Sequence, residues 1–208
     1  TAILGRRGAH MTEPSALPAL PTVVLGGYLG AGKTTLVNEL LRQAGGQRIA
    51  VLVNDFGDIN IDADLIVGAS GDVLALAGGC MCCSFGADLI GMLQRVLQRE
   101  PPPERVLIEC SGVGLPAAVA RAVRLLPQLS APAVVVVLDA AGVRERAADA
   151  YVGDTVRQQI HDAQALVLNK TDCCDAATLD ALHGWLAQAA PGVPVIETRH
   201  AELPADWV

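Results

Sequence analysis

Residues 26–35 read Gly26-Gly27-Tyr28-Leu29-Gly30-Ala31-Gly32-Lys33-Thr34-Thr35, and this stretch decides the fold. From Gly27 to Thr34 it matches the phosphate-loop pattern G-x-x-x-x-G-K-[ST]. The apolar residues 22–25 predict a strand that enters the loop, and residues 36–41 have the apolar spacing of a helix that leaves it. Glycines let the backbone wrap closely, so that its N–H groups and the helix N-terminus face a polyphosphate. The stretch therefore predicts a nucleotide site.

Two side chains of this loop are expected to act on the phosphates. Lys33 would reach the β- and γ-phosphates, and the Thr34 hydroxyl would hold Mg²⁺. Lys33 and Lys170 are the only lysines in a chain whose other basic residues are arginines, so lysine stands where a compact ammonium group is needed. The nucleotide-binding residues predicted here are Gly27, Gly30, Ala31, Gly32, Lys33, Thr34 and Thr35.

Composition excludes several classes of partner. The net charge of −7 gives no basic surface for nucleic acid. No apolar run approaches the roughly 18 residues that a membrane helix needs, so we expect no membrane contact. Six cysteines in 208 residues, several of them adjacent, are not typical of a secreted disulfide framework. We interpret them as reduced thiols or metal ligands and expect a cytoplasmic protein.

The rest of the chain alternates strand and helix patterns. Residues 1–21 are expected to be a leader and a flexible N-terminus, because Met11 resembles a natural start and prolines follow it. Residues 22–208 form the predicted domain. Its further strands are expected at 48–53, 72–77, 105–109, 133–138, 165–168 and 193–196, and its further helices at 88–98, 116–126 and 175–190. This alternation predicts an α/β fold, a doubly wound, mostly parallel sheet with flanking helices.

Acidic residues follow two of the predicted strands. The stretch 54–62 carries several carboxylates and is interpreted as a switch-like loop near Mg²⁺ and the γ-phosphate, or alternatively as a solvated acidic loop. Glu109 ends the strand 105–109, where a phosphate-loop protein places its second acid on the Mg²⁺ side. Lys33 and Glu109 are therefore the predicted catalytic residues, and Thr34 and Glu109 the predicted magnesium ligands. Gly112 would offer its N–H to the γ-phosphate.

Asn169-Lys170-Thr171-Asp172 follows the strand 165–168. The Asp172 carboxylate can accept hydrogen bonds from guanine N1–H and N2–H₂, which adenine does not offer. Asn169 would bind the other edge of the base, and the Lys170 stem would lie along its face. N-K-x-D downstream of a phosphate loop therefore predicts guanine recognition by Asn169, Lys170 and Asp172.

Cys80, Cys82 and Cys83 stand within four residues after Gly78-Gly79. This C-x-C-C arrangement can converge three thiolates on one soft or borderline cation. Zn²⁺ takes four ligands, so one position has to be filled from elsewhere. The alternative is a set of buried, inert thiols in an alanine-rich core. Cys110, Cys173 and Cys174 show no metal-ligand spacing, and for them we expect buried, inert thiols.

In this order the motifs resemble those of the CobW-type metal-chaperone GTPases. They are the phosphate loop, 54–57 (Asn-Asp-Phe-Gly), 79–83 (Gly-Cys-Met-Cys-Cys), 109–112 (Glu-Cys-Ser-Gly) and 169–172, and the resemblance covers residues 22–196. The chain departs from the family at Asp55 and Asp58, where the family has glutamate, and at Leu115, where it often has aspartate. The C-terminal domain usual in the family is expected to be absent.

The resemblance implies a GTPase that uses Mg²⁺ with GTP and carries Zn²⁺ or Co²⁺ on Cys80, Cys82 and Cys83 to a client metalloprotein. We also consider a nucleotide-dependent homodimer. Two alternatives remain open: a small-molecule phosphotransferase, and a passive zinc-binding module whose GTP site only sets the conformation.

Overall fold

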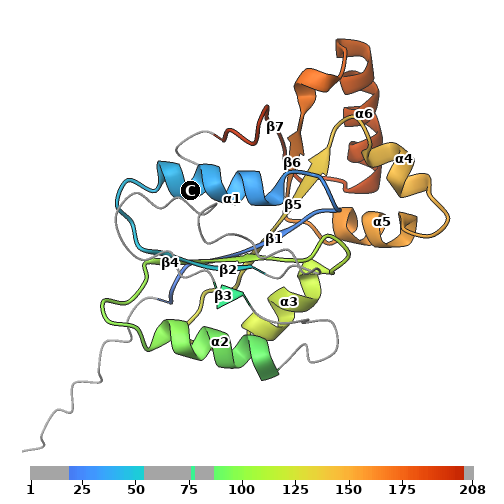
Figure 1. Ribbon diagram of the computed structural model, residues 1–208. Helices are drawn as coiled ribbons and strands as arrows, with labels where there is room; N and C mark the ends of the chain where they lie inside the picture. Colours follow the sequence, from blue (N-terminus) through green and yellow to red (C-terminus); the bar gives the residue numbers. More distant parts are fainter. Residues whose placement is uncertain (1–18, 54–75, 78–86, 204–208) are drawn as a thin grey trace, which may run out of the picture.

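The computed structural model describes residues 19–53, 76–77 and 87–203, and in this part of the chain one sheet organises the molecule (Figure 1). Its seven strands follow the order β3-β2-β4-β1-β5-β6-β7, and every neighbouring pair is parallel. The strands are β1 (Thr22–Gly26), β2 (Ile49–Val53), β3 (Leu76–Ala77), β4 (Arg105–Glu109), β5 (Ala133–Asp139), β6 (Ala165–Asn169) and β7 (Val195–Glu197). The predicted doubly wound, parallel sheet is confirmed.

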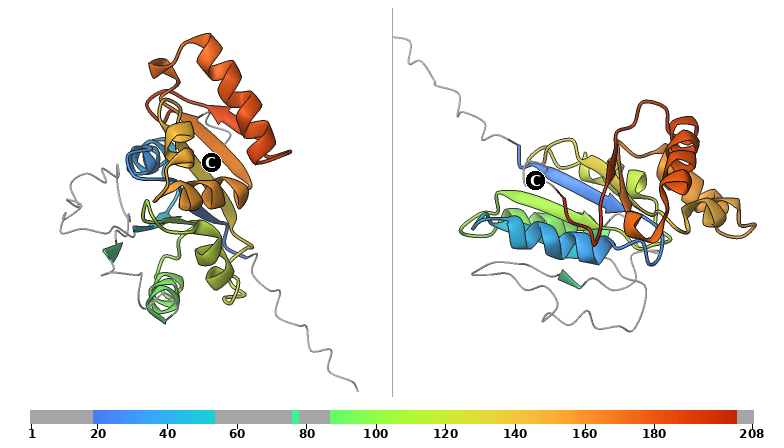
Figure 2. Two further views of the ribbon diagram at one scale, coloured as in Figure 1. Left: turned by 90° about the vertical axis from the view of Figure 1, so that its right-hand side faces the viewer. Right: turned by 90° about the horizontal axis from the view of Figure 1, so that it is seen from above.

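Helices cover both faces of this sheet. They are α1 (Lys33–Gln43), α2 (Ala87–Leu97), α3 (Pro116–Val123), α4 (Val143–Ala148), α5 (Gly153–His161) and α6 (Ala176–Ala189), with a short 3₁₀ turn, η2 (Thr171–Cys173). Figure 1 shows α1 on one face and α2 and α3 on the other. The left view in Figure 2 places α2 and α6 at opposite ends of the described part of the chain.

Two apolar clusters form the core, one on each face. Because side chains alternate along a strand, successive residues of β5 enter different clusters. Val136 and Leu138 pack with the helices opposite α1, whereas Val135 and Val137 pack with α1. Strands that bury both faces read as continuous apolar runs, which explains the sequence of β5.

The position of β1 determines where ligands can bind. It lies between β4 and β5, so the chain continues to one side of β1 and later returns to its other side. In such sheets ligands bind outside the carboxyl ends of the strands at this switch point. Gly26 ends β1, and the predicted phosphate loop starts there.

The segment between β5 and β6 is the main addition to the sequence prediction. Residues 140–164 were given no element, yet they form α4 and α5. Val143 and Ala147 are buried on α4, and Val156 and Ile160 on α5, so each short helix is held by two apolar residues four positions apart. Such short patterns are weak signals in the sequence.

Some predicted boundaries change. The helix expected at 116–126 ends at Val123, and Leu125 is largely exposed. Of the strand expected at 72–77 the structure describes only β3, and the acidic stretch 54–62 lies outside the described residues. None of the described helices is long and apolar enough to cross a membrane.

Candidate nucleotide site

The backbone of the phosphate loop depends on two glycines. Gly27 has φ +134°, and a Cβ there would lie 2.3 Å from the carbonyl oxygen of Val137. Gly32, which precedes α1, has φ +102°, and its Cβ would lie 2.3 Å from Nδ2 of Asn169. Both positions combine a left-handed conformation with a close neighbour, so only glycine fits.

Thr34 and Glu109 meet across this edge of the sheet. The Thr34 hydroxyl, in the first turn of α1, donates to Oε1 of Glu109 at 2.9 Å. The parallel pairing that sets Leu25 beside Glu109 brings the acid to the loop. Hydroxyl and carboxylate oxygens are ligands that suit Mg²⁺. The structure thus brings together the two residues predicted to hold this ion.

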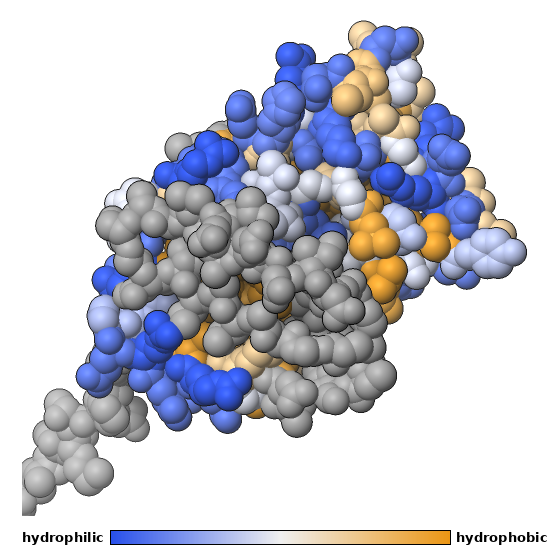
Figure 3. Space-filling model, viewed as in Figure 1, coloured by the Kyte–Doolittle hydropathy of each residue, from blue (hydrophilic) through white to orange (hydrophobic). Residues whose placement is uncertain are grey.

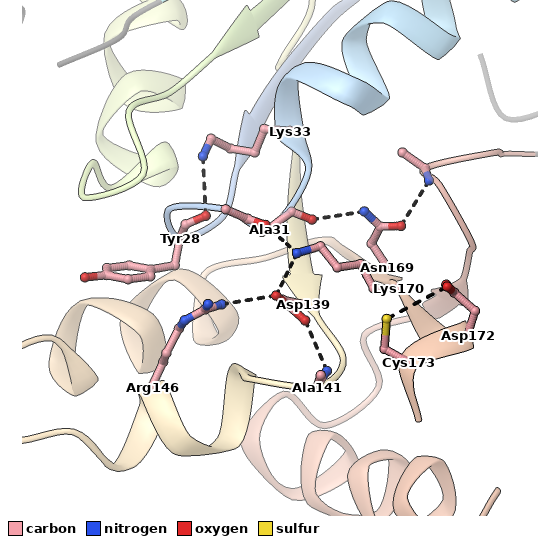
Figure 4. Close-up of polar contacts among 12 residues, drawn as sticks. Tyr28, Ala31, Lys33, Asp139, Ala141, Arg146, Asn169, Lys170, Asp172 and Cys173 are labelled. Carbon is pink, nitrogen blue, oxygen red and sulfur yellow. Dashed lines mark hydrogen bonds and ion pairs between the residues drawn. The ribbon is translucent and has the colours of Figure 1, made fainter. Parts of the chain in front are cut away.

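Lys33 lies at the start of α1, largely buried, with its ammonium group directed toward the loop (Figure 4). Its Nζ donates to the carbonyl oxygen of Tyr28 at 3.4 Å. Its charge also acts on Cys110, the residue after β4. Burial raises the pKa of the Cys110 thiol to about 12, against the lowering effect of Lys33 and together with the raising effect of Glu109. Cys110 is therefore buried, as the sequence predicted.

Asn169 joins three segments of the chain. Its Nδ2 donates to the carbonyl oxygen of Ala31 at 3.0 Å, and its Oδ1 accepts from the backbone N–H of Ala201 at 3.0 Å. The side chain is buried, with 2% of its surface exposed. Asn169 therefore ties the phosphate loop to the segment around Ala201 that follows β7. Its contact with a base remains a prediction.

Lys170 has a left-handed backbone (φ +62°) and also bridges two segments. Its Nζ donates to the carbonyl oxygen of Gly30 at 2.8 Å and to Oδ2 of Asp139 at 2.9 Å. Asp139, at the end of β5, also faces Arg146 at 3.5 Å and accepts from the N–H of Ala141.

These contacts set the ionisation of Asp139. Partial burial of Asp139 acts to raise its pKa, but the hydrogen bond and charge of Lys170, the Ala141 N–H and Arg146 together hold the pKa below its usual value. Asp139 was not among the predicted site residues. Its position beside β1 at the carboxyl edge is the signal that could have identified it.

Asp172, the predicted guanine reader, is exposed. Cys173 beside it is also exposed, and its Sγ lies 3.8 Å from Oδ2 of Asp172 (Figure 4). The prediction that Cys173 is buried is therefore wrong, and Cys174 is only partly buried. The chain leaves β6 through the 3₁₀ turn η2, which buries Thr171 and leaves Cys173 exposed.

The loop after β4 lies against the phosphate loop. A Cβ on Gly112 would lie within 2.7 Å of the backbone nitrogen of Leu29. Leu29, Val113 and Leu115 are exposed in these two loops, and apolar surface is visible in this part of Figure 3. Gly112 is thus placed beside the phosphate loop, as its predicted role requires.

The predicted metal thiolates, Cys80, Cys82 and Cys83, lie outside the described residues. Within the described ranges, no group of three or more His, Cys, Asp or Glu side chains could hold a metal ion. The strand that precedes the cysteine motif in the chain, β3, is among the described residues. Ala77 pairs with Val53, and Val53 pairs with Glu109.

Fold and loop together define a P-loop nucleotide-binding protein. A family model described as "CobW/HypB/UreG, nucleotide-binding domain" matches residues 21–197. The chain belongs to this family. Among curated relatives it is 32% identical to a protein named zinc chaperone CobW from Sinorhizobium sp, over 89% of this chain and 61% of the relative. It is 30% identical to zinc-regulated GTPase metalloprotein activator 1 of Schizosaccharomyces pombe, over 91% of this chain and 48% of the relative.

Solved structures share the fold. The Zn(II)-bound YjiA GTPase from E. coli aligns with a TM-score of 0.59 at 24% identity, over 86% of this chain and 57% of that one. The hydrogenase maturation factor HypB from Archaeoglobus fulgidus aligns with a TM-score of 0.60 at 18% identity, over 86% and 81%. The chain spans about half to three fifths of the length of the curated relatives named above.

Proposed function

We propose that this protein binds and hydrolyses GTP with Mg²⁺ and couples the nucleotide to the binding and delivery of a divalent transition metal, zinc or cobalt. The observation that carries the nucleotide part is the 2.9 Å contact between Thr34 and Glu109. It brings a phosphate-loop hydroxyl and a strand-ending carboxylate together beside a buried lysine. Membership of a nucleotide-binding family supports the same reading.

The chemistry follows from the charges at this edge. Thr34 and Glu109 would hold Mg²⁺, which when bound neutralises developing charge on the phosphates. Lys33 would place its ammonium group against the β- and γ-phosphates. Gly112 would donate its N–H to the γ-phosphate from the loop after β4. Asp172 would select guanine, because its carboxylate can accept two hydrogen bonds from that base.

The metal part of the proposal rests on the cysteine motif and on relatives named as zinc chaperones. We propose Cys80, Cys82 and Cys83 as the thiolate ligands. Ala77, three residues before Cys80, lies level with Glu109 and is separated from it by β2 alone. Adjacent strands are about 4.8 Å apart, so this starting point is roughly 10 Å from the magnesium side of the site. The cysteine segment is thus attached to a strand that ends near the magnesium side, which supports a coupling between metal and γ-phosphate.

The test is the dissociation constant of Co²⁺ measured with a Mg²⁺–GTP analogue, with GDP and without nucleotide. We expect the GTP analogue to tighten metal binding about 5- to 150-fold, and the metal to tighten the analogue by the same factor. Because free thiols titrate near pH 8.5, binding at pH 7 should also release protons. Three equal dissociation constants would leave two independent sites and remove the basis for metal delivery.

Spectroscopy separates the motif from the other thiols. Bound Co²⁺ should give thiolate charge-transfer bands that Cys82→Ser removes. Cys173→Ser is the matched control, because this thiol is exposed and stands outside the motif. Bands that persist in Cys82→Ser but vanish in Cys173→Ser would place the metal elsewhere.

A separate assay tests the phosphotransferase alternative. Release of phosphate from GTP in the absence of any acceptor molecule would argue against it.

A further inference from the structure

Gln159 of α5 is a buried polar residue that the motifs do not explain. Only 1% of its surface is exposed, and it lies between two core residues of the same helix, Val156 and Ile160. Its side-chain amide donates to the carbonyl oxygen of Gly114 at 2.7 Å and to that of Gly112 at 3.2 Å. Both N–H groups of the amide are thus used on one loop, 45 and 47 residues away in the chain.

This loop is the one that approaches the phosphate loop. Gly112 lies against Leu29, and the N–H of Gly114 donates to the carbonyl oxygen of Ser111 at 2.9 Å, which closes a tight turn. Gln159 holds the carbonyls of Gly112 and Gly114. Each carbonyl shares its peptide plane with the N–H of the next residue, so these bonds fix the directions of the Val113 and Leu115 N–H groups and, with them, the course of the loop that leaves Gly112.

The side-chain oxygen of Gln159 argues that this residue does more than stabilise the fold. Oε1 of Gln159 is buried and, among the described residues, receives no hydrogen bond. An unsatisfied buried polar atom costs free energy, and an apolar side chain of the same shape would avoid this cost. The residue is better explained by what its N–H groups hold in place.

We propose that Gln159 is a positioning residue that sets the loop 111–114 for the γ-phosphate, so that α5 takes part in distinguishing GTP from GDP. This inference rests on the proposed nucleotide function. Gln159 does not touch the nucleotide and acts through the peptide planes Gly112–Val113 and Gly114–Leu115, which hold the loop beside the phosphate loop. GDP has no γ-phosphate, so its binding should not depend on these planes.

The test compares Gln159→Met with the wild-type protein. Methionine has nearly the shape of glutamine but no N–H donor. Losing two hydrogen bonds that orient the loop should weaken binding of a Mg²⁺–GTP analogue roughly tenfold, while GDP affinity changes less than about twofold. The matched control is Gln158→Met. Gln158 is exposed on the same helix and donates to Asp162, so this change should leave both affinities as they are.

Equal losses for the analogue and for GDP would show a merely structural role and overturn the inference. Affinities for the GTP analogue and for GDP that both stay at the wild-type values in folded Gln159→Met protein would overturn it too, while the nucleotide function would stand. A wild-type protein that binds neither nucleotide would overturn the proposed function and the inference with it.

A second measurement needs no variant. Hydrogen exchange on the wild-type protein should show that the GTP analogue protects residues 111–115 and α5 more than GDP does. Equal protection by the two nucleotides would contradict the role given to Gln159, even if Gln159→Met failed to fold.

Discussion

The phosphate-side half of the site, around Thr34 and Glu109, differs from the base-side half, around Asn169 and Lys170, in what its polar side chains bind. On the phosphate side, a hydroxyl and a carboxylate face each other at the mouth of the loop. On the base side, Asn169 and Lys170 are committed to backbone carbonyls of the phosphate loop, and Asp172 remains exposed. One half presents groups to a ligand, whereas the other mainly holds the loops in register. Substitutions on the phosphate side should therefore lower activity, whereas substitutions of the committed residues on the base side should lower the stability of the fold.

The largest effect is expected at Lys33. Under the proposed function, Lys33→Ala would remove the ammonium group that neutralises the phosphates, so turnover should nearly vanish while the fold persists. Unstimulated hydrolysis by the wild-type protein should be slow, roughly 10⁻⁴ to 10⁻² s⁻¹. Single-turnover phosphate release measures both. Undiminished turnover in folded Lys33→Ala protein would exclude the phosphate-loop mechanism.

Asp172→Asn tests the exposed member of the base side. Hydrogen bonds to a charged acceptor are worth about 1.5–3 kcal/mol each, so losing a pair should lower GTP affinity about a hundredfold or more. The amide can donate to the additional carbonyl of xanthine, so preference should move toward xanthosine nucleotides. Thermal stability should not change, because the residue is exposed. A wild-type protein that binds ATP as well as GTP would contradict guanine selection.

Asn169→Ala should instead affect stability. It leaves the carbonyl of Ala31 and the N–H of Ala201 without their partner, at buried positions, which costs about 2–4 kcal/mol. Urea unfolding measures this loss. Asn38→Ala on α1 is the control, because the Asn38 Oδ1 accepts no hydrogen bond from the described residues. Normal stability combined with a strong loss of GTP affinity would mean that Asn169 reads the base rather than tying the loops.

The smallest effect is expected from acid. The pKa of Asp139 is lowered in the folded protein, so its contribution to stability is complete above the unfolded-state pKa near 3.9. The contribution is lost as the pH falls through the lower, folded-state pKa. Asp139→Asn should therefore flatten the decline of stability below about pH 4, seen in urea unfolding at several pH values. Asp180→Asn, on the exposed side of α6, should keep the wild-type slope.

The sheet and the phosphate loop could be predicted because their signals are local. An apolar strand such as β5 and the glycines around Lys33 specify their conformations within a few residues. The pairing of Thr34 with Glu109 was also predictable, since Glu109 ends β4 and Thr34 begins the helix that follows the loop after β1, the neighbouring parallel strand.

The parts that escaped prediction depend on contacts distant in the chain. Gln159 has no motif around it, and its partners are 45 and 47 residues away. The motif around Asn169 predicts a contact with the base, which stays a prediction, but it does not reveal that Ala31 and Ala201 bind the same amide. A motif identifies the loop in which a residue stands, but packing against other segments decides which atoms remain for a ligand.

The hydrogen bond between Thr34 and Glu109 has a consequence for nucleotide exchange. The Thr34 hydroxyl directs its proton to the carboxylate, so the contact joins two groups that would hold Mg²⁺ under the proposed function. Binding of Mg²⁺ would have to replace this hydrogen bond, and release of GDP with its metal would let it form again. The fold would thus offer the two groups to each other as an alternative to the ion during exchange.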